Sequence, residues 1–583
     1  MKDFEDKTLS AEKRVEDLLP RMSLEEKAGM LFQNMFGCGP VDKPFSQFNL
    51  PPVKEQIENL KMNHFNLIGS LDTAKDMAKV YNDAQEIAAS VGQGIPLSVS
   101  TDPRNGVSDN PLAAMLSGPF SQWPEPLGFA ALRDPERIKQ FGNMIRQEYN
   151  AVGIRVALHP QIDLSTEYRW PRINGTYGED ANLTSKLGVA YIQGLQTNDF
   201  GYESVSAMAK HFPGGGAQGN DGEDSHFAYG KDQIYPGENW NYHLEPFKAV
   251  IKAGVRQMMP YYGRPIGTHM EEVGFGFNKG VLTDLLRKEL GFTGIICTDW
   301  GLVTDAEVFG KPFPARAWGA ENLTEEERVL KILDAGADQF GGESRPDLII
   351  KLVKDGKLDE KRVDISVYRL LMEKFLLGLF DEKRFVDIDQ ANSLVKTAEI
   401  EAASYKAQSE SVTVLKNEEF LPLKKGINVY LEGMNEEAVR SSEFAKVVDV
   451  PEKADVAILR VVGPYDHNRE GFDAFFHAGS LEFSSEEIAH IKDISSKVPT
   501  VVDMYTERPA VLTNVIDYPS AWTLTYGTSD KALLDVYFGD VKPLGKIPFD
   551  LPRSQKAVEE SRADMQFDTD NPLFKFGYGL IYP

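Results

Sequence analysis

The sequence predicts an α/β protein in which a (β/α)8-type TIM barrel is followed by a smaller α/β (αβα) sandwich domain. Strand-like and helix-like segments alternate from about residue 23 to about residue 380, which indicates a largely parallel sheet, most economically a closed barrel. A polar connection and a shorter alternating region follow, as is typical of a second domain. We expect a barrel domain over residues 1–385, a linker over 386–405 and a sandwich domain over 406–583.

Capping signals and apolar runs define the barrel elements. Ser23-Leu-Glu-Glu26 is a capping box that predicts an opening helix. Asp134-Pro135 predicts another helix start, with Asp as the cap and Pro in the first turn. Between the helices, short apolar runs predict buried strands. These runs are Pro96–Thr101, Arg155–His159, Ser204–Lys210, Gln257–Tyr261, Gly294–Thr298 and Ala335–Phe340.

The second region repeats this alternation on a smaller scale. A helix is expected to open near Ala402, and apolar strands are expected at Ala454–Val462, Thr500–Met504 and Ala521–Leu524. The tail over residues 545–580 is dense in Pro, Gly and aromatic residues, so we expect it to wrap the domain as an ordered loop.

Composition limits the classes of partner. The formal net charge of −25 argues against nucleic acid or an anionic membrane, because phosphate attraction needs clustered Lys and Arg. The two cysteines, Cys38 and Cys297, provide neither a disulfide framework nor a thiolate metal site. No secretion signal or membrane-spanning run is seen, so a cytoplasmic location is expected, although a chain trimmed of its leader would look the same. The sequence leaves the oligomeric state open, a homodimer included.

The run Gly291–Trp300 carries the strongest functional signal. It reads as a buried strand that ends on Asp299, followed at once by Trp300. Polar residues at the carboxyl ends of barrel strands face the active-site mouth. Asp299 is therefore a candidate nucleophile, and Trp300 offers a flat apolar platform. A helix-capping role for Asp299 is the structural alternative.

Other predicted strand ends bring further polar groups to the same mouth. They are Asp102, Arg172, Lys210, His211, Met259 and Tyr262. This set suits a neutral ligand with many hydroxyl groups. It suits a nucleotide poorly, because the glycine-rich loop after Lys210 lacks the Gly-Lys-Ser/Thr ending of a phosphate loop.

Four motifs in order make the chain similar to glycoside hydrolase family 3, the β-glucosidase and exo-glucanase group. They are Met22–Lys27, Lys210–Gly214, Cys297–Trp300 and Pro572–Leu580. The resemblance implies a barrel and an α/β sandwich with the sugar site between them. It implies that Asp299 is the nucleophile and that no metal or organic cofactor is needed. It also implies sugar-binding positions at Asp102, Arg172, Lys210, His211 and Tyr262, with Met259 and Trp300 lining the same subsite.

The acid/base residue is less well determined. Family β-glucosidases often take it from a second-domain loop, and Arg469-Glu470-Gly-Phe-Asp473 is the nearest match, so Glu470 is the first candidate. Asp473, Asp466 and Glu482 are rivals. N-acetylglucosaminidase-type members instead use a His held by an Asp, and Asp224-Ser225-His226 resembles that triplet. A purely structural role for His226 is the further alternative.

The implied reaction is retaining hydrolysis of a terminal non-reducing β-D-glucosyl or xylosyl residue through a glycosyl-Asp299 intermediate. Glu470 must stay protonated to assist the leaving group, and we expect the apolar side chains of Phe472, Phe475 and Phe476 to raise its pKa. One alternative is a β-N-acetylhexosaminidase that uses Asp224 and His226. Another is a catalytically silent sugar-binding protein on the same scaffold.

Overall fold

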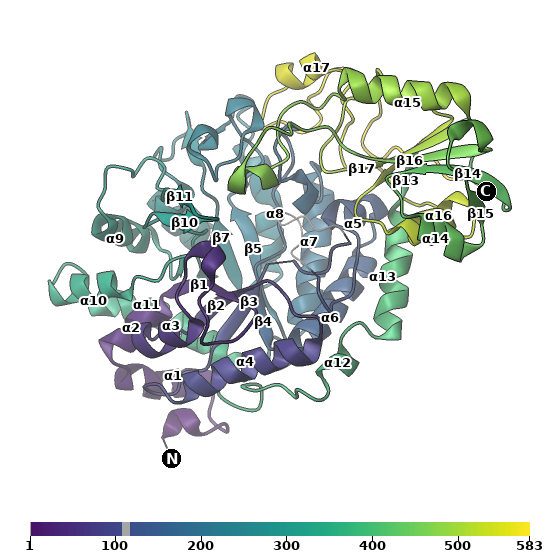
Figure 1. The fold of residues 1–583 in the computed structure, drawn as a ribbon. Coiled ribbons are helices and arrows are strands. Elements are labelled where there is room, and N and C mark those ends of the chain that lie inside the picture. The colour runs from purple at the N-terminus through teal and green to yellow at the C-terminus, as the bar shows by residue number, and fades with distance from the viewer. Residues whose placement is uncertain (1, 108–116, 583) are drawn as a thin grey trace.

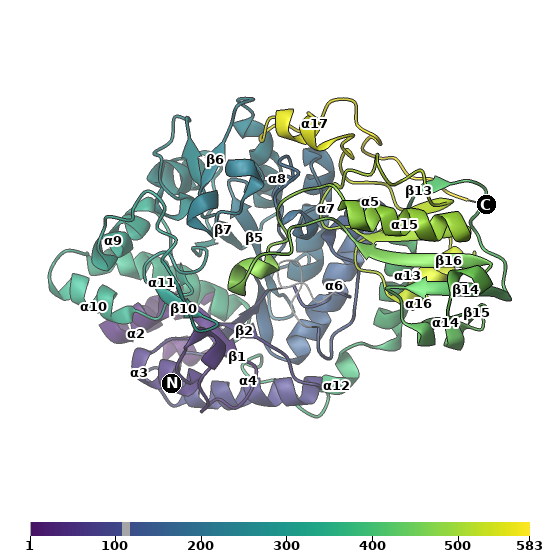
Figure 2. The same cartoon turned by 45° about the horizontal axis from the view of Figure 1, so that its top comes forward.

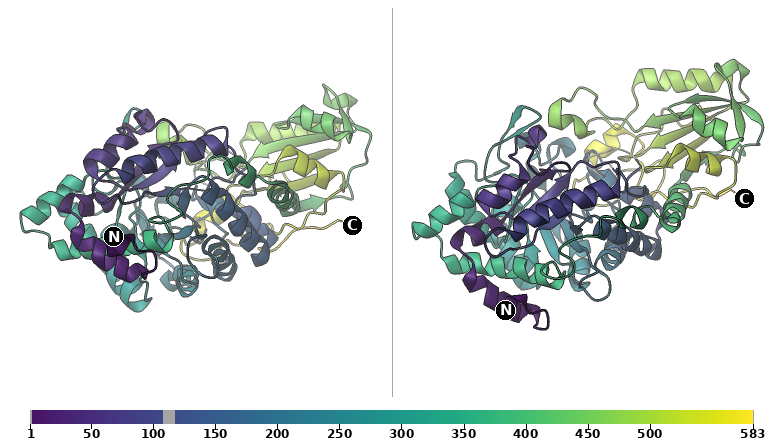
Figure 3. Two further views of the ribbon diagram at one scale, coloured as in Figure 1. Left: turned by 90° about the horizontal axis from the view of Figure 1, so that it is seen from below. Right: turned by 60° about the horizontal axis from the view of Figure 1, so that its bottom comes forward.

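The computed structural model describes residues 2–107 and 117–582, which fold into a barrel domain and a smaller sheet domain beside it (Figure 1). The amino-terminal end lies on the barrel and the carboxyl-terminal end on the far side of the sheet domain (Figure 3). Within the described residues no helix combines the length and apolar character needed to cross a membrane.

The first domain is a barrel of parallel strands in the order β12-β1-β2-β3-β4-β5-β7-β9. Short contacts between the outer two strands close it, since the Thr298 N–H donates to the Gln339 carbonyl at 2.9 Å. The strands are β1 (Phe32–Gly37), β2 (His64–Ile68), β3 (Ser98–Thr101), β4 (Ile154–Ala157), β5 (Ser206–Phe212), β7 (Gln257–Pro260), β9 (Ile295–Ile296) and β12 (Phe340–Gly341). The predicted barrel is confirmed.

Helices surround this sheet and cover its outer face (Figure 1). They include α1 (Ala11–Leu18), α2 (Leu24–Met30), α3 (Val53–Leu60), α4 (Ala74–Ala89), α5 (Pro126–Leu132), α6 (Pro135–Ala151), α7 (Ala181–Gln196), α8 (Trp240–Lys252), α9 (Glu325–Ala335), α10 (Pro346–Lys354) and α11 (Glu360–Leu376). Both predicted caps are confirmed. The Ser23 hydroxyl accepts from the Glu26 N–H at 3.2 Å, and the Asp134 carboxylate accepts from the Glu136 N–H at 3.0 Å.

Two parts of the barrel differ from the sequence prediction. Strands β1 and β2 were not predicted, because Gln33, Asn34 and Asn66 interrupt their apolar character. The predicted strand Ala335–Phe340 is wrong over most of its length. Its first residue ends α9, a turn follows, and only Phe340 lies in β12.

The second domain is a six-stranded sheet in the order β13-β18-β17-β16-β14-β15. All neighbours pair in parallel except β13 and β18. Its strands are β13 (Thr413–Asn417), β14 (Ile427–Glu432), β15 (Ala445–Val447), β16 (Val456–Val462), β17 (Thr500–Tyr505) and β18 (Ala521–Thr525). Helix α15 (Ser485–Lys497) covers one face, and α14 (Glu436–Ser442) and α16 (Asp530–Tyr537) cover the other (Figure 2). The predicted sandwich is confirmed.

The junction between the domains is helical, with α12 (Ala391–Leu394) followed by α13 (Ala398–Ser411). Helix α13 is capped by the Thr397 hydroxyl, so it begins before the predicted position at Ala402. The helix packs against α5 of the barrel and α16 of the sandwich. It therefore links the two domains through packing as well as through the chain.

The carboxyl-terminal segment, which includes α17 (Gln555–Glu560), returns to the barrel as an ordered wrap. The buried carboxylate of Glu179 accepts from the Asp550 N–H at 2.8 Å and from the Phe567 N–H at 2.6 Å. In the opposite direction, the Asp564 carboxylate accepts from the Gly237 N–H at 2.8 Å. These bonds fix the sandwich domain on the barrel, because buried backbone donors need such partners.

Candidate active site

A cavity of about 580 Å³ opens at the carboxyl ends of the barrel strands. The sandwich domain contributes Phe472 and Phe475 to its wall through the short helix Gly471–Phe475, which reaches over the barrel (Figure 2). Nine of the residues predicted from sequence line it together: Asp102, Arg172, Lys210, His211, His226, Met259, Tyr262, Asp299 and Trp300.

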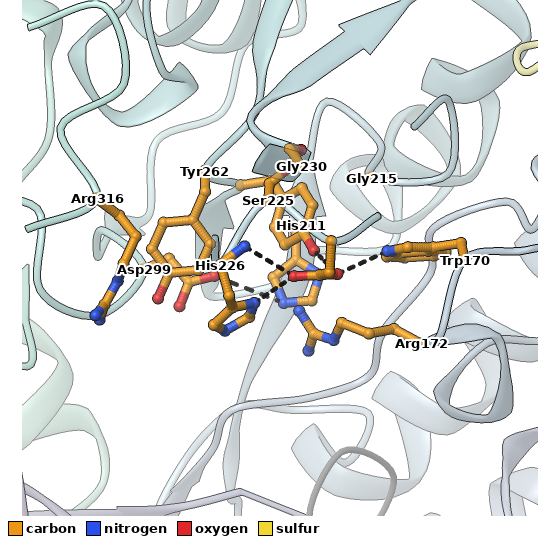
Figure 4. A network of polar contacts seen from close by, with 12 residues as sticks. Trp170, Arg172, His211, Gly215, Ser225, His226, Gly230, Tyr262, Asp299 and Arg316 are labelled. Atoms are coloured by element: carbon orange, nitrogen blue, oxygen red, sulfur yellow. Dashed lines mark hydrogen bonds and ion pairs between the residues drawn. The ribbon is translucent and has the colours of Figure 1, made fainter. Parts of the chain in front are cut away.

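Asp299 lies directly after β9 with its carboxylate in this cavity (Figure 4). One carboxylate oxygen, Oδ1, accepts from the Trp300 N–H at 2.8 Å. The other, Oδ2, is buried without a hydrogen-bond partner and lies 3.8 Å from Nε2 of His211. The backbone thus orients the carboxylate and leaves Oδ2 without a hydrogen-bond partner in the protein. Asp299 caps no helix, so the structural alternative for this residue does not hold.

Lys210 and Asp102 form an ion pair at one wall of the cavity, with Nζ 2.8 Å from Oδ1. Asn66 donates to the other Asp102 oxygen at 3.0 Å. Burial alone would raise the pKa of Asp102, but the Lys210 charge and these hydrogen bonds outweigh it and lower the pKa below the ordinary value. Asp102 is therefore an ionised acceptor suited to sugar hydroxyl groups.

His211 is held by a second carboxylate, which the sequence prediction did not assign. Its Nδ1 lies 2.8 Å from Oδ2 of Asp163, and Oδ1 of Asp163 accepts from the Gly215 N–H at 2.5 Å. Burial, and then the Arg172 charge, lower the pKa of His211 well below its usual value. We infer that the ring is neutral, with Nδ1–H donating to Asp163 and Nε2 directed towards Asp299.

Arg172 and Trp300, which line the cavity, carry donor groups without a partner in the protein. Nε and Nη1 of Arg172 and Nε1 of Trp300 are buried without a partner. Burial alone would lower the pKa of Arg172, but neighbouring Tyr261, Asp224 and Asp299 raise it, so the guanidinium stays charged. Buried donors normally have partners, and several unpaired ones in one cavity indicate a ligand with many acceptors.

Asp224 and His226 form a second Asp–His pair at the same cavity, and Figure 4 shows His226 beside Asp299. Nδ1 of His226 lies 2.6 Å from Oδ1 of Asp224. The other Asp224 oxygen accepts from Trp170 Nε1 at 2.7 Å and from the Tyr261 hydroxyl at 2.5 Å. Burial alone would raise the pKa of Asp224, but His226, the Arg172 charge and the Tyr261 hydroxyl lower it, so the carboxylate stays ionised. The His226 ring packs against Tyr262, with their centroids 4.6 Å apart.

The side chain of Glu470 does not line this cavity. It is 85% exposed and pairs with Nζ of Lys311 at 3.5 Å. The apolar setting predicted for Glu470 is therefore wrong. Phe472 and Phe476 pack against His226 instead, with ring centroids 6.1 and 5.1 Å away.

The rival carboxylates of the second domain do not line the cavity either. Asp473 pairs with Arg469 at 3.0 Å, and Asp466 accepts no bond in the cavity, which neither residue lines. Glu482 lies outside the cavity as well. Within residues 2–107 and 117–582, no three His, Cys, Asp or Glu side chains gather in a way that could hold a metal ion.

An aromatic entrance surrounds the outer part of the cavity. The hairpin of β10 (Ala306–Val308) and β11 (Lys311–Phe313) carries Phe309, which is 43% exposed. Its ring centroid lies 5.8 Å from that of Phe48 and 5.9 Å from that of Phe475. The sequence prediction did not include Phe48 or Phe309 and placed Phe475 beside Glu470 instead, because three distant segments supply these rings.

Comparison with known proteins shows which family has this architecture. Residues 23–372 match the Glycosyl hydrolase family 3 N terminal domain, and residues 427–582 match the Glycosyl hydrolase family 3 C-terminal domain. Beta-glucosidase C of Emericella nidulans is 50% identical over 584 residues, covering 99% of this chain and 94% of that protein. Periplasmic beta-glucosidase/beta-xylosidase of Dickeya chrysanthemi is 41% identical over 602 residues, covering 99% and 91%.

Solved structures agree on the fold. A β-glucosidase from Erythrobacter marinus superimposes with a TM-score of 0.79 at 22% identity, covering 100% of this chain and 84% of that one. A β-glucosidase from Listeria innocua in complex with isofagomine gives 0.76 at 21%, covering 98% and 83%. The two matched domains extend over most of the chain, which therefore belongs to glycosyl hydrolase family 3 and is a glycosidase.

Proposed function

We propose that this family member is a retaining, exo-acting β-glucosidase that removes terminal non-reducing β-D-glucosyl residues. The observation that carries the proposal is Oδ2 of Asp299, which has no hydrogen-bond partner within the protein and belongs to a cavity that Arg172 and Trp300 also line. The names of the relatives at 50% and 41% identity support glucosides as substrates.

The wall around Asp299 fits one neutral sugar. Asp102 is an acceptor for hydroxyl groups, whereas Lys210 and Arg172 are donors. Trp300 and Met259 add apolar surface, and stacking against a ring is how proteins bind the apolar face of a sugar. These side chains offer partners to the hydroxyl groups of a single sugar, which favours cleavage of a terminal residue.

The proton donor follows from the same geometry, which favours His226 over Glu470. His226 lines the cavity and is held at Nδ1 by Asp224, so Nε2 is the nitrogen available to an aglycone oxygen. Glu470, which the family resemblance suggests, is exposed and paired with Lys311. A buried His held by a carboxylate is a suitable general acid, because the carboxylate orients the ring and stabilises its protonated form.

The reaction then proceeds in two displacements. Asp299 Oδ2 attacks the anomeric carbon while the C–O bond to the aglycone breaks, and protonated His226 transfers its Nε2 proton to the departing oxygen. Neutral His226 next removes a proton from water as the water oxygen attacks the glycosyl ester. Glucose leaves with retained configuration, and both side chains return to their starting states.

Covalent trapping tests the nucleophile. Incubation with a 2-fluoro β-glucoside bearing a good leaving group should stop turnover and leave one fluoroglucosyl group on the peptide that contains Asp299. Mass spectrometry of the digested protein would show this label. A label on another carboxylate, or release of α-glucose detected by NMR, would contradict the proposal.

A variant pair tests the proton donor. With His226→Ala, substrates with poor leaving groups should slow about 10²-fold or more, while dinitrophenyl glucoside should be spared in the first step. Azide should then restore turnover and yield β-glucosyl azide. If Glu470→Ala shows this behaviour and His226→Ala does not, the second-domain carboxylate is the acid/base.

The substrate range is tested with nitrophenyl sugars. We expect the β-glucoside to exceed both the β-xyloside and the N-acetyl-β-glucosaminide in kcat/KM. The N-acetyl-β-glucosaminide is included because an Asp–His pair like Asp224 and His226 is typical of the N-acetylglucosaminidase-type alternative. Preference for the glucosaminide would replace the glucosidase proposal with that activity.

A further inference from the structure

Arg469, which lies on the sandwich domain, forms a bidentate ion pair with the barrel. Its Nη2 lies 2.5 Å from Oε1 of Glu223, and its Nη1 lies 3.0 Å from Oε2 of the same residue. Both side chains are largely buried, with 14% and 24% of their surface exposed. Two parallel bonds of this kind fix orientation as well as distance, which a lysine ammonium could not do.

Glu223 immediately precedes Asp224, the carboxylate that holds His226. The segment from Glu223 to His226 contains no regular helix or strand, so its position depends on side-chain anchors. On the barrel side, Trp318 Nε1 donates to the Ser225 carbonyl at 2.8 Å. On the sandwich side, Arg469 anchors the Glu223 side chain, and Phe476 packs on the His226 ring.

We propose that Arg469 is a positioning residue, which holds the Asp224–His226 pair in the cavity so that domain docking completes the acid/base. This inference rests on the proposed role of His226. It assigns the sandwich domain an indirect catalytic function: the domain supplies the support for a proton donor that the barrel carries. Arg469 itself does not line the cavity and is not expected to touch the substrate.

A neighbouring ion pair provides a matched control. Lys311 of the barrel hairpin pairs with Glu470, one residue from Arg469, and so also joins the two domains. That pair is exposed, with 64% and 85% of the two side chains accessible. Because exposed ion pairs contribute little, Lys311→Ala should leave the kinetics nearly unchanged.

The experiment compares Arg469→Ala, Glu223→Gln and Lys311→Ala on aryl β-glucosides whose leaving groups differ in pKa. In the first two variants we expect kcat/KM to fall about 10–100-fold for poor leaving groups and less than about 3-fold for dinitrophenyl glucoside. Arg469→Lys should restore part of the loss. An equal loss on every substrate would show a general structural role and overturn the proposal.

The two proposals fail in distinguishable ways. If His226→Ala shows no dependence on the leaving group, His226 is not the proton donor, whatever Arg469 does. If His226→Ala shows that dependence but Arg469→Ala matches the Lys311→Ala control, only the positioning role is overturned. Should Arg469→Ala fail to fold, the charge-exchanged pair Arg469→Glu with Glu223→Arg decides the question: recovery with poor leaving groups supports the proposal, and no recovery contradicts it.

Discussion

At the scale of single residues, the cavity is organised by carboxylates that hold basic groups in place. Asp163 holds His211, Asp224 holds His226, and Asp102 pairs with Lys210. Asp163 and Asp224 are almost fully buried, whereas Asp102 is 30% exposed and its partner Lys210 is the more buried of the two. Such arrangements fix the protonation state and direction of a side chain before the substrate arrives.

Replacing the proposed nucleophile should abolish turnover without unfolding the protein. With Asp299→Ala we expect kcat on nitrophenyl β-glucoside to fall by about 10⁴-fold or more, because the side chain that would form the glycosyl ester is removed. Steady-state kinetics measure the loss, and a thermal melt within a few degrees of the parent protein is the control. Near-normal turnover would remove Asp299 from the mechanism.

The pH dependence of catalysis should show the protonation state of His226. Burial lowers its pKa below the ordinary 6.5, although the Asp224 carboxylate opposes this effect. Because the imidazole must carry a proton to act as the acid, kcat/KM should fall as the pH rises through a value below 6.5. The optimum should therefore be acidic.

A pH–rate profile on a substrate with a poor leaving group measures this limb. In His226→Ala the same limb should disappear, since no imidazole remains to titrate. Persistence of an unchanged alkaline limb in that variant would assign it to another group.

The sequence predicted the functional residues at strand ends better than those in loops. Asp299, Lys210 and Asp102 were accessible to prediction because a parallel strand has only one end that faces the barrel mouth. The position of Glu470 depends on where a long loop settles against another domain, and local sequence does not encode that. Asp163 follows no clear strand signal, so its bond to His211 was visible only in three dimensions.

At the scale of secondary-structure elements, the β10–β11 hairpin completes the cavity entrance. Its Phe309 contacts rings from the amino-terminal region and from the sandwich domain. Five of the eight barrel strands were predicted, whereas this hairpin was not, since its strands are short and exposed. Entrance elements of this kind distinguish substrates by their aglycones while leaving the sugar subsite unchanged.

Truncating the hairpin ring should change aglycone preference. With Phe309→Ala we expect KM for aryl glucosides to rise about 3–10-fold, because a ring contact contributes about 1 kcal/mol. Methyl β-glucoside, which has no ring to stack, should change little. Comparing KM for the two substrates provides the measurement, and equal changes in both would argue against an aglycone contact.

At the scale of the whole molecule, the domain interface contains a carboxyl group whose burial favours the neutral form. Glu125 of the barrel accepts from the Tyr505 hydroxyl of the sandwich domain at 2.6 Å. Burial raises its pKa to about 8, the Tyr505 bond opposes this, and the charge of Glu507 adds to it. The protonated form is therefore the one that fits the docked domains.

This group should make the stability of the docked protein depend on pH. A carboxyl whose pKa rises from 4.5 to about 8 on folding contributes stability that is fully present below 4.5 and is lost as the pH rises through about 8. In Glu125→Gln the amide cannot ionise, and its oxygen can still accept from Tyr505. Thermal melts from about pH 5 to about pH 8 should therefore fall more steeply for the parent protein than for this variant. Parallel curves would show that Glu125 is already ionised in the docked state, in which case the interface would have to accommodate a buried charge.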